Sequence, residues 1–511
     1  MLAIVNSLAL VGLQGEKIQV EVDVSGGLPC FEIVGLPDTS VRESRERVRT
    51  AIKNSGFEFP AKRITVNLAP ADLKKEGPGF DLPIAIGILV ATGQLDNQLL
   101  DNYYFVGELS LEGTLRKVPG ILPMACYFKK DTNYYLVVPE DCAIEAALAE
   151  TIKVFGANSL SQIVSHLNKI EVMEPKSIDH NTLFSKVIND ELDFAEVYGH
   201  EAVKRGLEVA AAGGHNVLLL GPPGSGKTML AKRVLSILPS LQLEEALSVS
   251  KIYSSAGLLN ATKPLITERP FRSPHHTSSA ASLIGGGRVP KPGEVSLATS
   301  GILFLDELPE YRRDVLEALR QPLEDRVVTV SRVAAAVTYP ADFMLIASMN
   351  PCPCGFLGDP EKECSCTPYQ IQRYRSKISG PLLDRIDIQL EVPRIKYKDL
   401  EQQQKSESSR EIKERVELAR TMQRQRFKKH GVECNAQMTP KLVRKYCLLS
   451  SEAKSLLKMA FEQLTLSMRA HDRILKIART IADLAGSEII ETEHLAEAIQ
   501  YRILDKQQNI I

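Results

Sequence analysis

The chain has 511 residues, 44% of them hydrophobic and 24% charged, a composition typical of a globular protein with about three domains. Its 62 basic and 63 acidic residues give a net charge of -1, which excludes a polycation that binds nucleic acid over its whole surface. The absence of tryptophan and an aromatic share of 6% argue against a surface built from base-stacking platforms.

The first twelve residues, MLAIVNSLALVG, are apolar but lack the basic start and small-residue cleavage site of a signal peptide. We predict a buried first strand there. The sequence contains no uninterrupted apolar run of about 18 residues, so we predict no membrane span. Four of the nine cysteines cluster within a short segment, which suggests a reduced compartment rather than a disulfide framework. We therefore expect a cytoplasmic protein.

Short β-branched runs alternate with helical patterns between residues 1 and 168. Residues 169–191 are polar and lack a clear period, which predicts a linker. Residues 192–395 follow a strand–loop–helix pattern typical of a nucleotide-binding α/β domain, and residues 396–511 read as amphipathic helices. The predicted fold class is therefore multidomain α/β. In the first region we predict strands at 17–25, 63–70, 103–110 and 134–140, and helices at 38–55 and 81–92.

A phosphate-binding loop is indicated by the run GPPGSGKT, which follows an apolar strand and precedes a helical pattern. Glycines let the backbone wrap the phosphates of ATP, and the helix N-terminus attracts the anion. Lys227 would reach the β and γ oxygens, and Thr228 would bind Mg²⁺. The alternative is a chance glycine turn. The predicted nucleotide-binding residues are Gly221, Pro222, Pro223, Gly224, Ser225, Gly226, Lys227 and Thr228.

Polar residues end the next two predicted strands. The first strand ends in Asp306 and Glu307, which would complete the Mg²⁺ shell and polarise the attacking water, respectively. The second ends in Asn350, whose amide would orient that water or sense the γ-phosphate. The alternative for Asn350 is a capping residue at a strand end.

Two arginine-containing segments complete the predicted site. In GPLLDRID, Arg385 would reach the γ-phosphate bound to a neighbouring subunit, with Arg375 as a second choice. The alternative role of Arg385 is an ordinary salt bridge to Asp384 or Asp387. In the helical region, Arg469 is favoured over a second arginine, Arg473, as the residue that closes a lid onto the phosphates.

With these parts in order, the chain resembles an AAA+ ATPase, and more closely the Mg-chelatase-like family of bacterial ComM and YifB proteins. The resemblance covers nearly the whole chain. Its carriers are FEIVGLPDTSVRESRERVRTAI, the phosphate-binding loop, RPFRSPHHTSS, GEVSLATSGILFLDELPE, MNPCPCG, GPLLDRIDI and RAHDRILKIARTIADL.

The resemblance implies a homohexameric ring with ATP sites between subunits, using ATP and Mg²⁺. It also implies an N-terminal α+β domain with the Lon protease fold (like domain 2 of ribosomal protein S5), a central AAA+ P-loop α/β domain and a C-terminal α-helical lid. In ComM-type members the role is ATP-driven DNA branch migration in recombination and natural transformation, which implies DNA and recombination proteins as partners.

Lon-type proteolysis needs a Ser–Lys dyad, and this chain departs from that pattern. Gly79 stands where the serine should be, and Leu122 stands where the lysine should be. A glycine cannot be a nucleophile and a leucine cannot activate one. We therefore expect the fold without the protease chemistry.

Two loops are candidates for DNA contact. The pattern from 325 to 339 predicts a β-hairpin, which related AAA+ rings place in the central pore. Arg326 and Arg332 on it would meet phosphates, as would Arg288 and Lys291 on the glycine-rich loop 285–291. The alternative for both loops is solvated surface charge.

Two further groups of metal-ligating residue types occur. His275 and His276 are adjacent, so hydrogen bonding within the site is favoured over shared metal ligation. Four cysteines form a C-x-C…C-x-C pair directly after Asn350, and four thiolates suit tetrahedral zinc. The alternative is free buried or redox-sensitive thiols. These four are Cys352, Cys354, Cys364 and Cys366.

The site motifs predict an ATPase, and the resemblance implies that it is a hexameric AAA+ motor that acts on branched DNA. The alternative is a chelatase-type AAA+ ATPase that remodels a protein partner without DNA translocation. An active protease is disfavoured by the two dyad positions.

Overall fold

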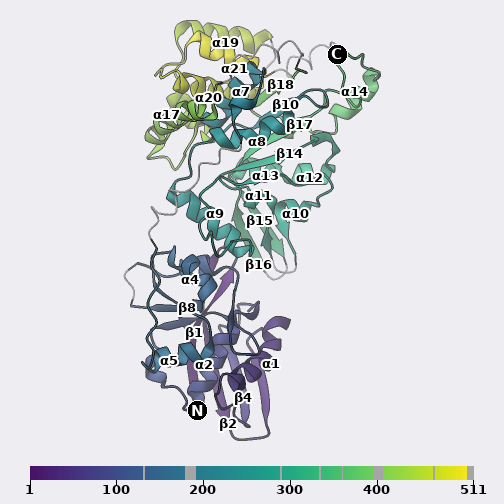
Figure 1. Cartoon of the computed structure of the whole chain (residues 1–511). Coiled ribbons are helices and arrows are strands. Elements are labelled where there is room, and N and C mark those ends of the chain that lie inside the picture. Colours follow the sequence, from purple (N-terminus) through teal and green to yellow (C-terminus); the bar gives the residue numbers. More distant parts are fainter. Residues whose placement is uncertain are drawn as a thin grey trace. The chain divides into compact units, whose positions relative to one another are not determined.

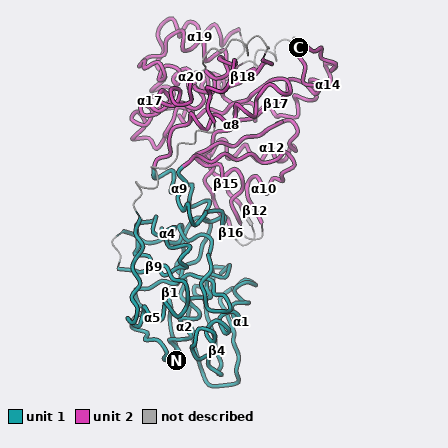
Figure 2. The backbone as a smooth tube through the Cα atoms, in the orientation of Figure 1, with its two compact units in different colours: residues 1–186, 243–267 teal, residues 187–242, 268–511 magenta. Residues whose placement is uncertain are grey.

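A computed structural model of the chain describes residues 1–130, 133–178, 192–287, 290–332, 335–359, 361–395, 407–463 and 467–502. The chain forms two compact units, shown in different colours in Figure 2. The first unit joins residues 1–186 to 243–267, and the second joins 187–242 to 268–511. The segment 243–267 therefore packs with the N-terminal region, although it lies between two parts of the second unit in sequence. Within the predicted linker, residues 179–191 lie outside the described part of the chain.

The first unit is built on a seven-stranded sheet in the order β3-β4-β2-β1-β5-β8-β9. Strands β1, β2, β4 and β8 of this sheet are labelled in Figure 1. β1 and β2 form an antiparallel hairpin in which Val5 faces Val20, and both are fully buried. This confirms the buried first strand, and the strands predicted from the β-branched runs are also present. The strands are β1 (Leu2–Val11), β2 (Gln14–Ser25), β3 (Cys30–Val34), β4 (Arg63–Ala69), β5 (Tyr103–Phe105), β8 (Tyr135–Pro139) and β9 (Lys153–Ala157).

The helices of the first unit follow from their caps and apolar faces. α1 begins after Asp38, whose carboxylate accepts a hydrogen bond from the Val41 N–H at 2.8 Å. Every residue of α2 is buried, and Gly87 permits its close approach to the sheet because a Cβ there would lie 2.5 Å from Val22. The helices are α1 (Thr39–Asn54), α2 (Asp81–Ala91), α3 (Ile121–Ala125), α4 (Glu140–Ala147), α5 (Leu160–Leu167) and α9 (Leu243–Ser255), with a small hairpin of β6 (Glu108–Leu109) and β7 (Leu115–Arg116).

α9 is tied into the first unit by buried polar contacts. The Ser254 hydroxyl donates to Glu145 Oε1 at 2.6 Å, and its carbonyl accepts from the Gly120 N–H at 3.0 Å. Burial raises the pKa of Glu145, while the hydrogen bonds from the Ser254 hydroxyl and the Leu122 N–H oppose the rise. The Leu122 N–H donates to the same carboxylate, and the Leu122 side chain is fully buried. Gly79 is also buried, so both residues that replace the serine and lysine of the Lon-type dyad belong to the packed interior.

The second unit contains a five-stranded parallel sheet in the order β11-β14-β17-β10-β18. Every residue of β10, β14 and β17 is buried, as expected for a parallel sheet covered on both faces. The carboxyl ends of these three adjacent strands form the edge where ligands bind in such sheets. The strands are β10 (Val217–Leu220), β11 (Phe271–Arg272), β14 (Ile302–Leu305), β17 (Met344–Met349) and β18 (Ile388–Glu391).

Helices and two small hairpins surround this sheet. The helices are α7 (Glu201–Gly213), α8 (Lys227–Ile237), α10 (Ala280–Ile284), α11 (Glu294–Leu297), α12 (Arg313–Ala318), α13 (Arg320–Asp325), α14 (Pro368–Arg375) and α15 (Gly380–Leu383). The hairpins pair β12 (Gly285–Gly286) with β13 (Lys291–Pro292), and β15 (Val327–Arg332) with β16 (Ala335–Pro340).

The C-terminal part of the described chain is helical, as predicted. α17 begins with a capping box in which Ser408 and Glu411 exchange side-chain to backbone hydrogen bonds. α17 and α20 both pack against α7, the helix that precedes the phosphate-binding strand. The helices are α17 (Ser409–Phe427), α18 (Pro440–Tyr446), α19 (Ser451–Gln463), α20 (Met468–Leu484) and α21 (Thr492–Gln500).

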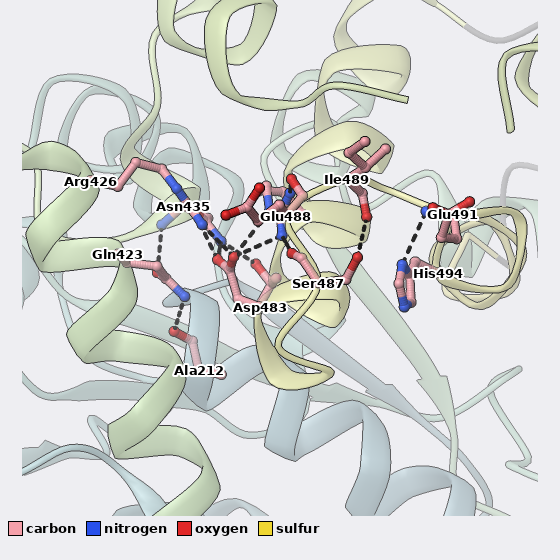
Figure 3. A network of polar contacts seen from close by, with 12 residues as sticks. Ala212, Gln423, Arg426, Asn435, Asp483, Ser487, Glu488, Ile489, Glu491 and His494 are labelled. Carbon is pink, nitrogen blue, oxygen red and sulfur yellow. Dashed lines mark hydrogen bonds and ion pairs between the residues drawn. The ribbon is translucent and has the colours of Figure 1, made fainter. Parts of the chain in front are cut away.

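A buried polar network holds these helices together (Figure 3). Asp483 at its centre accepts hydrogen bonds from Arg426 at 2.9 Å, Asn435 at 2.8 Å and Arg479 at 3.0 Å. Gln423 extends the network to the carbonyl of Ala212, at the end of α7. The helical region is thereby fixed to the segment that leads into the phosphate-binding loop. No helix in the described part of the chain is long and apolar enough to cross a membrane.

Candidate nucleotide-binding site

The phosphate-binding loop connects strand β10, which lies between β17 and β18, to α8. Gly224 and Gly226 have φ angles of +77° and +87°, a region that glycine adopts without steric cost. The loop thus turns tightly, so that α8 begins at Lys227 with its N-terminus at the sheet edge. Just before β10, the Asn216 amide accepts from the Leu345 N–H at 2.8 Å and donates to the Arg385 carbonyl at 2.9 Å. Asn216 therefore links the strands on either side of β10.

Lys227 lies over its own loop. Its Nζ donates to the carbonyls of Gly221 at 2.8 Å and Pro222 at 2.9 Å, and to Oδ1 of Asn350 at 3.2 Å. Burial lowers the pKa of Lys227, while the charges of the two carboxylates after β14 oppose that shift. The ammonium can exchange these carbonyl contacts for phosphate oxygens with little movement. Lys227 and Asn350, predicted from separate motifs, are brought into direct contact.

Thr228 and Asp306 are also in contact. The Thr228 hydroxyl donates to Asp306 Oδ2 at 2.9 Å. A hydroxyl and a carboxylate so arranged at the end of a phosphate-binding loop match the ligands that hold Mg²⁺ in P-loop ATPases. These two residues could therefore hold the metal that neutralises developing phosphate charge.

Ser348 is a site residue that the sequence analysis missed. It is fully buried on β17, its hydroxyl donates to Asp306 Oδ1, and it accepts the Glu307 N–H at 3.1 Å. Ser348 thereby orients both carboxylate-bearing residues. The available signal was a polar residue in an otherwise apolar buried strand, since buried hydroxyls require partners.

Glu307 has an unusual backbone. Its φ of +53° and ψ of +51° place a residue other than glycine in the left-handed region. Such a conformation costs roughly 1–3 kcal/mol and concentrates at functional sites. Its side chain is exposed. This arrangement suits a carboxylate that must reach a water molecule at the γ-phosphate.

Arg385 is held within its own chain. It donates to the carbonyl of Pro381 at 2.7 Å and forms an ion pair with Glu324, leaving 13% of its side chain exposed. The salt bridge considered from the sequence thus forms with Glu324 on α13, a partner distant in sequence. Arg375, the second choice, lies on α14, and its Nε donates to the Pro351 carbonyl at 3.4 Å.

The two lid arginines differ in their freedom. Arg473 lies 3.4 Å from Asp387, is 18% exposed, and has its pKa lowered by burial. Arg469 is 63% exposed, and its Nη1 lies 4.0 Å from Asp384 Oδ2. Arg469 is therefore the residue of the two that can move toward a phosphate without leaving a buried carboxylate unpaired.

The two histidines lie on the loop after β11. His275 shares a 2.8 Å hydrogen bond with the hydroxyl of Thr277, and the rings of His275 and His276 are 4.1 Å apart between centroids. Tyr311 donates to the carbonyl of Pro274 at 2.6 Å and fixes this loop. His275 therefore hydrogen-bonds locally, as the sequence analysis favoured.

The four cysteines come together. Their sulfur atoms all lie within 4.8 Å of one another, and Cys352 is fully buried. The cluster is a candidate metal centre directly after Asn350. It consists of Cys352, Cys354, Cys364 and Cys366.

The two candidate DNA loops pack against each other. Tyr339 of β16 donates at 2.8 Å to the carbonyl of Pro290, in the turn between β12 and β13, so the two hairpins are linked. Lys291 is exposed, whereas Arg326 caps α13 and lies 3.5 Å from Asp342. Arg288 and the side chain of Arg332 lie outside the described residues.

Comparison with known proteins agrees with this geometry. Residues 193–400 match the model described as magnesium chelatase, subunit ChlI. Residues 20–142 match subunit ChlI of Mg-chelatase, and residues 406–502 match the C-terminal part of that subunit. The chain is 46% identical to YifB of Escherichia coli K12 over 508 residues, covering 99% of this chain and 98% of that protein.

It is 44% identical to the competence protein ComM of Haemophilus influenzae over 506 residues, covering 98% of each chain. The chain belongs to the Mg-chelatase-like ComM/YifB family. Membership in this AAA+ family indicates an ATPase that uses ATP and Mg²⁺ and forms oligomers.

Proposed function

We propose that this ComM/YifB-family chain is a cytoplasmic, homohexameric motor that uses ATP to drive DNA branch migration in homologous recombination and natural transformation. The ATPase activity is supported by two hydrogen bonds at one edge of the sheet. One joins Lys227 to Asn350, and the other joins Thr228 to Asp306. The DNA part is supported by 44% identity, over nearly the whole chain, to a relative named a competence protein.

In the proposed reaction, Lys227 and the backbone N–H groups of its loop bind the phosphates. Thr228 and Asp306 would hold Mg²⁺, which would supply positive charge beside the transferred phosphoryl group. Glu307 polarises the attacking water, and Asn350 orients it. The carbonyl and Asn350 contacts of Lys227 are the ones that the phosphates would replace on binding.

Arg385 is proposed to complete the site of a neighbouring subunit. Its partner within the chain, Glu324, is a surface carboxylate, 58% exposed, so the ion pair can exchange for a phosphate at moderate cost. Arg469 is proposed as the lid residue that approaches the phosphates. A site shared in this way makes hydrolysis depend on assembly.

DNA contact is proposed for the paired hairpins β12–β13 and β15–β16. Lys291 is exposed there, and Arg288 and Arg332 are proposed to add charge. Arg326 is proposed to brace the base of the second hairpin through Asp342, rather than to meet phosphate as its first contact. Phosphate contacts would give salt-dependent, sequence-independent affinity.

For the first unit, we propose the fold of the Lon protease catalytic domain without its activity. The buried Gly79 and Leu122 support the lack of protease activity, because neither carries a nucleophile or a base. Remodelling of a protein partner is the second candidate function, and the match of residues 193–400 to a magnesium chelatase subunit favours it.

The test is ATP turnover by the full chain with and without four-way junction DNA at low salt. We expect stimulation by the junction and movement of its branch point, with Lys227→Ala inactive and Glu307→Gln retaining bound ATP. Turnover that survives Lys227→Ala would contradict the ATPase site. Robust turnover with neither DNA binding nor stimulation would instead favour the protein-remodelling function.

A further inference from the structure

We propose that the four-cysteine cluster binds one Zn²⁺ ion, and that the metal-bound loop holds the phosphate-binding loop in place through a contact between Gly355 and Pro223. The second half of this inference rests on the proposed nucleotide site. The first half concerns a metal centre and stands independently of it.

The sulfur geometry fits a tetrahedral ion. Cys352 lies 3.3 Å from Cys354 and 3.6 Å from Cys364 between sulfurs, and the latter two are 3.6 Å apart. Four ligands at about 2.3 Å from zinc lie about 3.8 Å from one another in a tetrahedron. The same distances are far from the roughly 2.05 Å of a disulfide. The cluster therefore matches a metal-thiolate site.

A backbone donor points at one of the sulfurs. The Cys354 N–H donates to Cys366 Sγ at 3.4 Å. Four thiolates around a divalent ion carry a net charge of -2, and hydrogen bonds to the sulfurs stabilise that charge. Two cations, Lys362 and Arg394, lie over the Phe356 ring at 5.0 and 5.9 Å from its centroid.

The cysteine loop presses on the phosphate-binding loop at one point. Gly355 has a φ of +85°, and a Cβ atom placed there would lie 2.5 Å from Cδ of Pro223. The turn is closed by the Gly355 N–H, which donates to the Cys352 carbonyl at 3.0 Å. Pro223 therefore rests on backbone that a metal ligand fixes directly.

The other end of the cluster fixes Asn350. Cys352 follows Asn350 by two residues, and Asn350 accepts the hydrogen bond of Lys227. Cys352 and Cys364 are twelve residues apart in sequence, so a metal ion would close this loop firmly. Zinc would thus set the positions of Asn350 and Pro223 together, on two sides of the phosphate site.

The metal half is tested on the purified full chain. We expect about one zinc per chain, and none after the double substitution Cys364→Ser and Cys366→Ser. Growth with Co²⁺ in place of zinc should give the intense visible absorption of tetrahedral cobalt thiolates in the native chain, so a folding defect of the variant cannot decide the result. A native chain with no zinc and no cobalt spectrum would overturn the metal site.

The coupling half is tested with a matched pair of glycines. Gly355→Ala should keep its zinc but bind a fluorescent ATP analogue about tenfold or more weakly, because its methyl group displaces Pro223. Gly358→Ala is the control, because Gly358 has a similar φ of +79° and open space around it. We expect it to keep both zinc and native nucleotide affinity.

The outcomes separate the two proposals. Equal nucleotide affinities for the native chain, Gly355→Ala and the zinc-free variant would overturn the coupling while leaving the ATPase intact. Failure of the native chain to bind nucleotide would contradict the proposed function, while the zinc measurement would still stand.

Discussion

The Thr228 hydroxyl and Asp306 Oδ2 lie 2.9 Å apart, joined by a hydrogen bond between two residues that are 78 positions apart in sequence. Two proposed Mg²⁺ ligands therefore already face each other. The metal can enter by displacing one hydrogen bond rather than by assembling its ligands. This preorganisation depends on the buried hydroxyl of Ser348, which donates a hydrogen bond to the other oxygen of the Asp306 carboxylate.

Replacing Ser348 with alanine should weaken Mg²⁺ binding without removing a ligand. Loss of such an orienting partner typically costs about 10–100-fold in metal affinity or activity. We expect the Mg²⁺ concentration for half-maximal ATPase activity to rise by that factor, with activity recovered at high Mg²⁺. Ser348→Thr retains the hydroxyl and should stay near native. An unchanged Mg²⁺ dependence in Ser348→Ala would contradict the role.

Arg385→Ala should reduce ATP turnover by roughly a thousandfold if the arginine stabilises the departing phosphoryl group, the effect expected of an arginine finger. Glu324→Gln removes only its resting partner and should leave turnover at or above native. Mixing Arg385→Ala chains with Glu307→Gln chains should restore part of the activity, because one chain supplies the arginine and the other the carboxylate. No recovery on mixing would show that the arginine does not act between chains.

Local sequence patterns predicted the candidate site residues that directly follow the end of an apolar strand. The phosphate-binding loop, Asp306 and Asn350 are all of this kind, and the structure brings them to one edge. Ser348 was missed because its hydroxyl lies within a strand whose pattern reads only as buried sheet. The family was identified correctly from several long motifs.

Pairings between distant elements could not be predicted. Glu324 meets Arg385 across 61 positions, and no local spacing encodes that contact. The packing of α9 in the first unit could not be predicted either, because the apolar pattern of a helix does not indicate which hydrophobic core it packs against. Its anchor, the hydrogen bond from Ser254 to Glu145, exists only in the folded chain.

The buried network around Asp483 should dominate the stability of the helical region (Figure 3). Asp483→Ala would leave Arg479, which is 1% exposed, without its carboxylate. Removing one partner of a buried ion pair costs about 3–5 kcal/mol. We expect a clear fall in the thermal unfolding midpoint. Glu493→Ala is the control because Glu493 is 83% exposed, and an equal fall in both variants would contradict the prediction.

Asp387 should make stability depend on acid pH. Burial alone would raise the pKa of Asp387, but the charge of Arg473, 3.4 Å away, lowers it below its usual value. Asn216 adds an N–H donor at 3.1 Å. A carboxylate with a lowered folded pKa stabilises the fold above its unfolded pKa of about 3.9, and this stabilisation is lost as the pH falls through the folded pKa.

The measurement compares the unfolding free energies of the native chain and Asp387→Asn across pH. The difference should be constant near neutral pH and should shrink below about pH 4, where the unfolded chain binds a proton that the folded chain resists. Asp384→Asn removes a more exposed carboxylate 4.0 Å from its partner and should show a small difference. If the difference in unfolding free energy between the native chain and Asp387→Asn does not depend on pH, the substitution acts through packing and not through the charge of Asp387.

Lys291 offers a test of the DNA surface that is separate from the ATP site. It is exposed on the loop that Tyr339 ties to the second hairpin through Pro290. If Lys291 contacts a phosphate, Lys291→Ala should weaken binding equally for different DNA sequences. It should also reduce the salt slope of the affinity by about 1, since one fewer counterion is released.

The control for Lys291 is Lys153→Ala, which removes an exposed lysine from the edge strand β9 of the first unit. Tyr339→Phe removes only the hydroxyl that holds the two hairpins together, so it should lower DNA affinity without changing the salt slope. This distinction follows because positioning changes the fit of the loops, whereas a lost charge changes the number of ions released. An unchanged slope in Lys291→Ala would exclude Lys291 from direct phosphate contact and shift the DNA surface elsewhere.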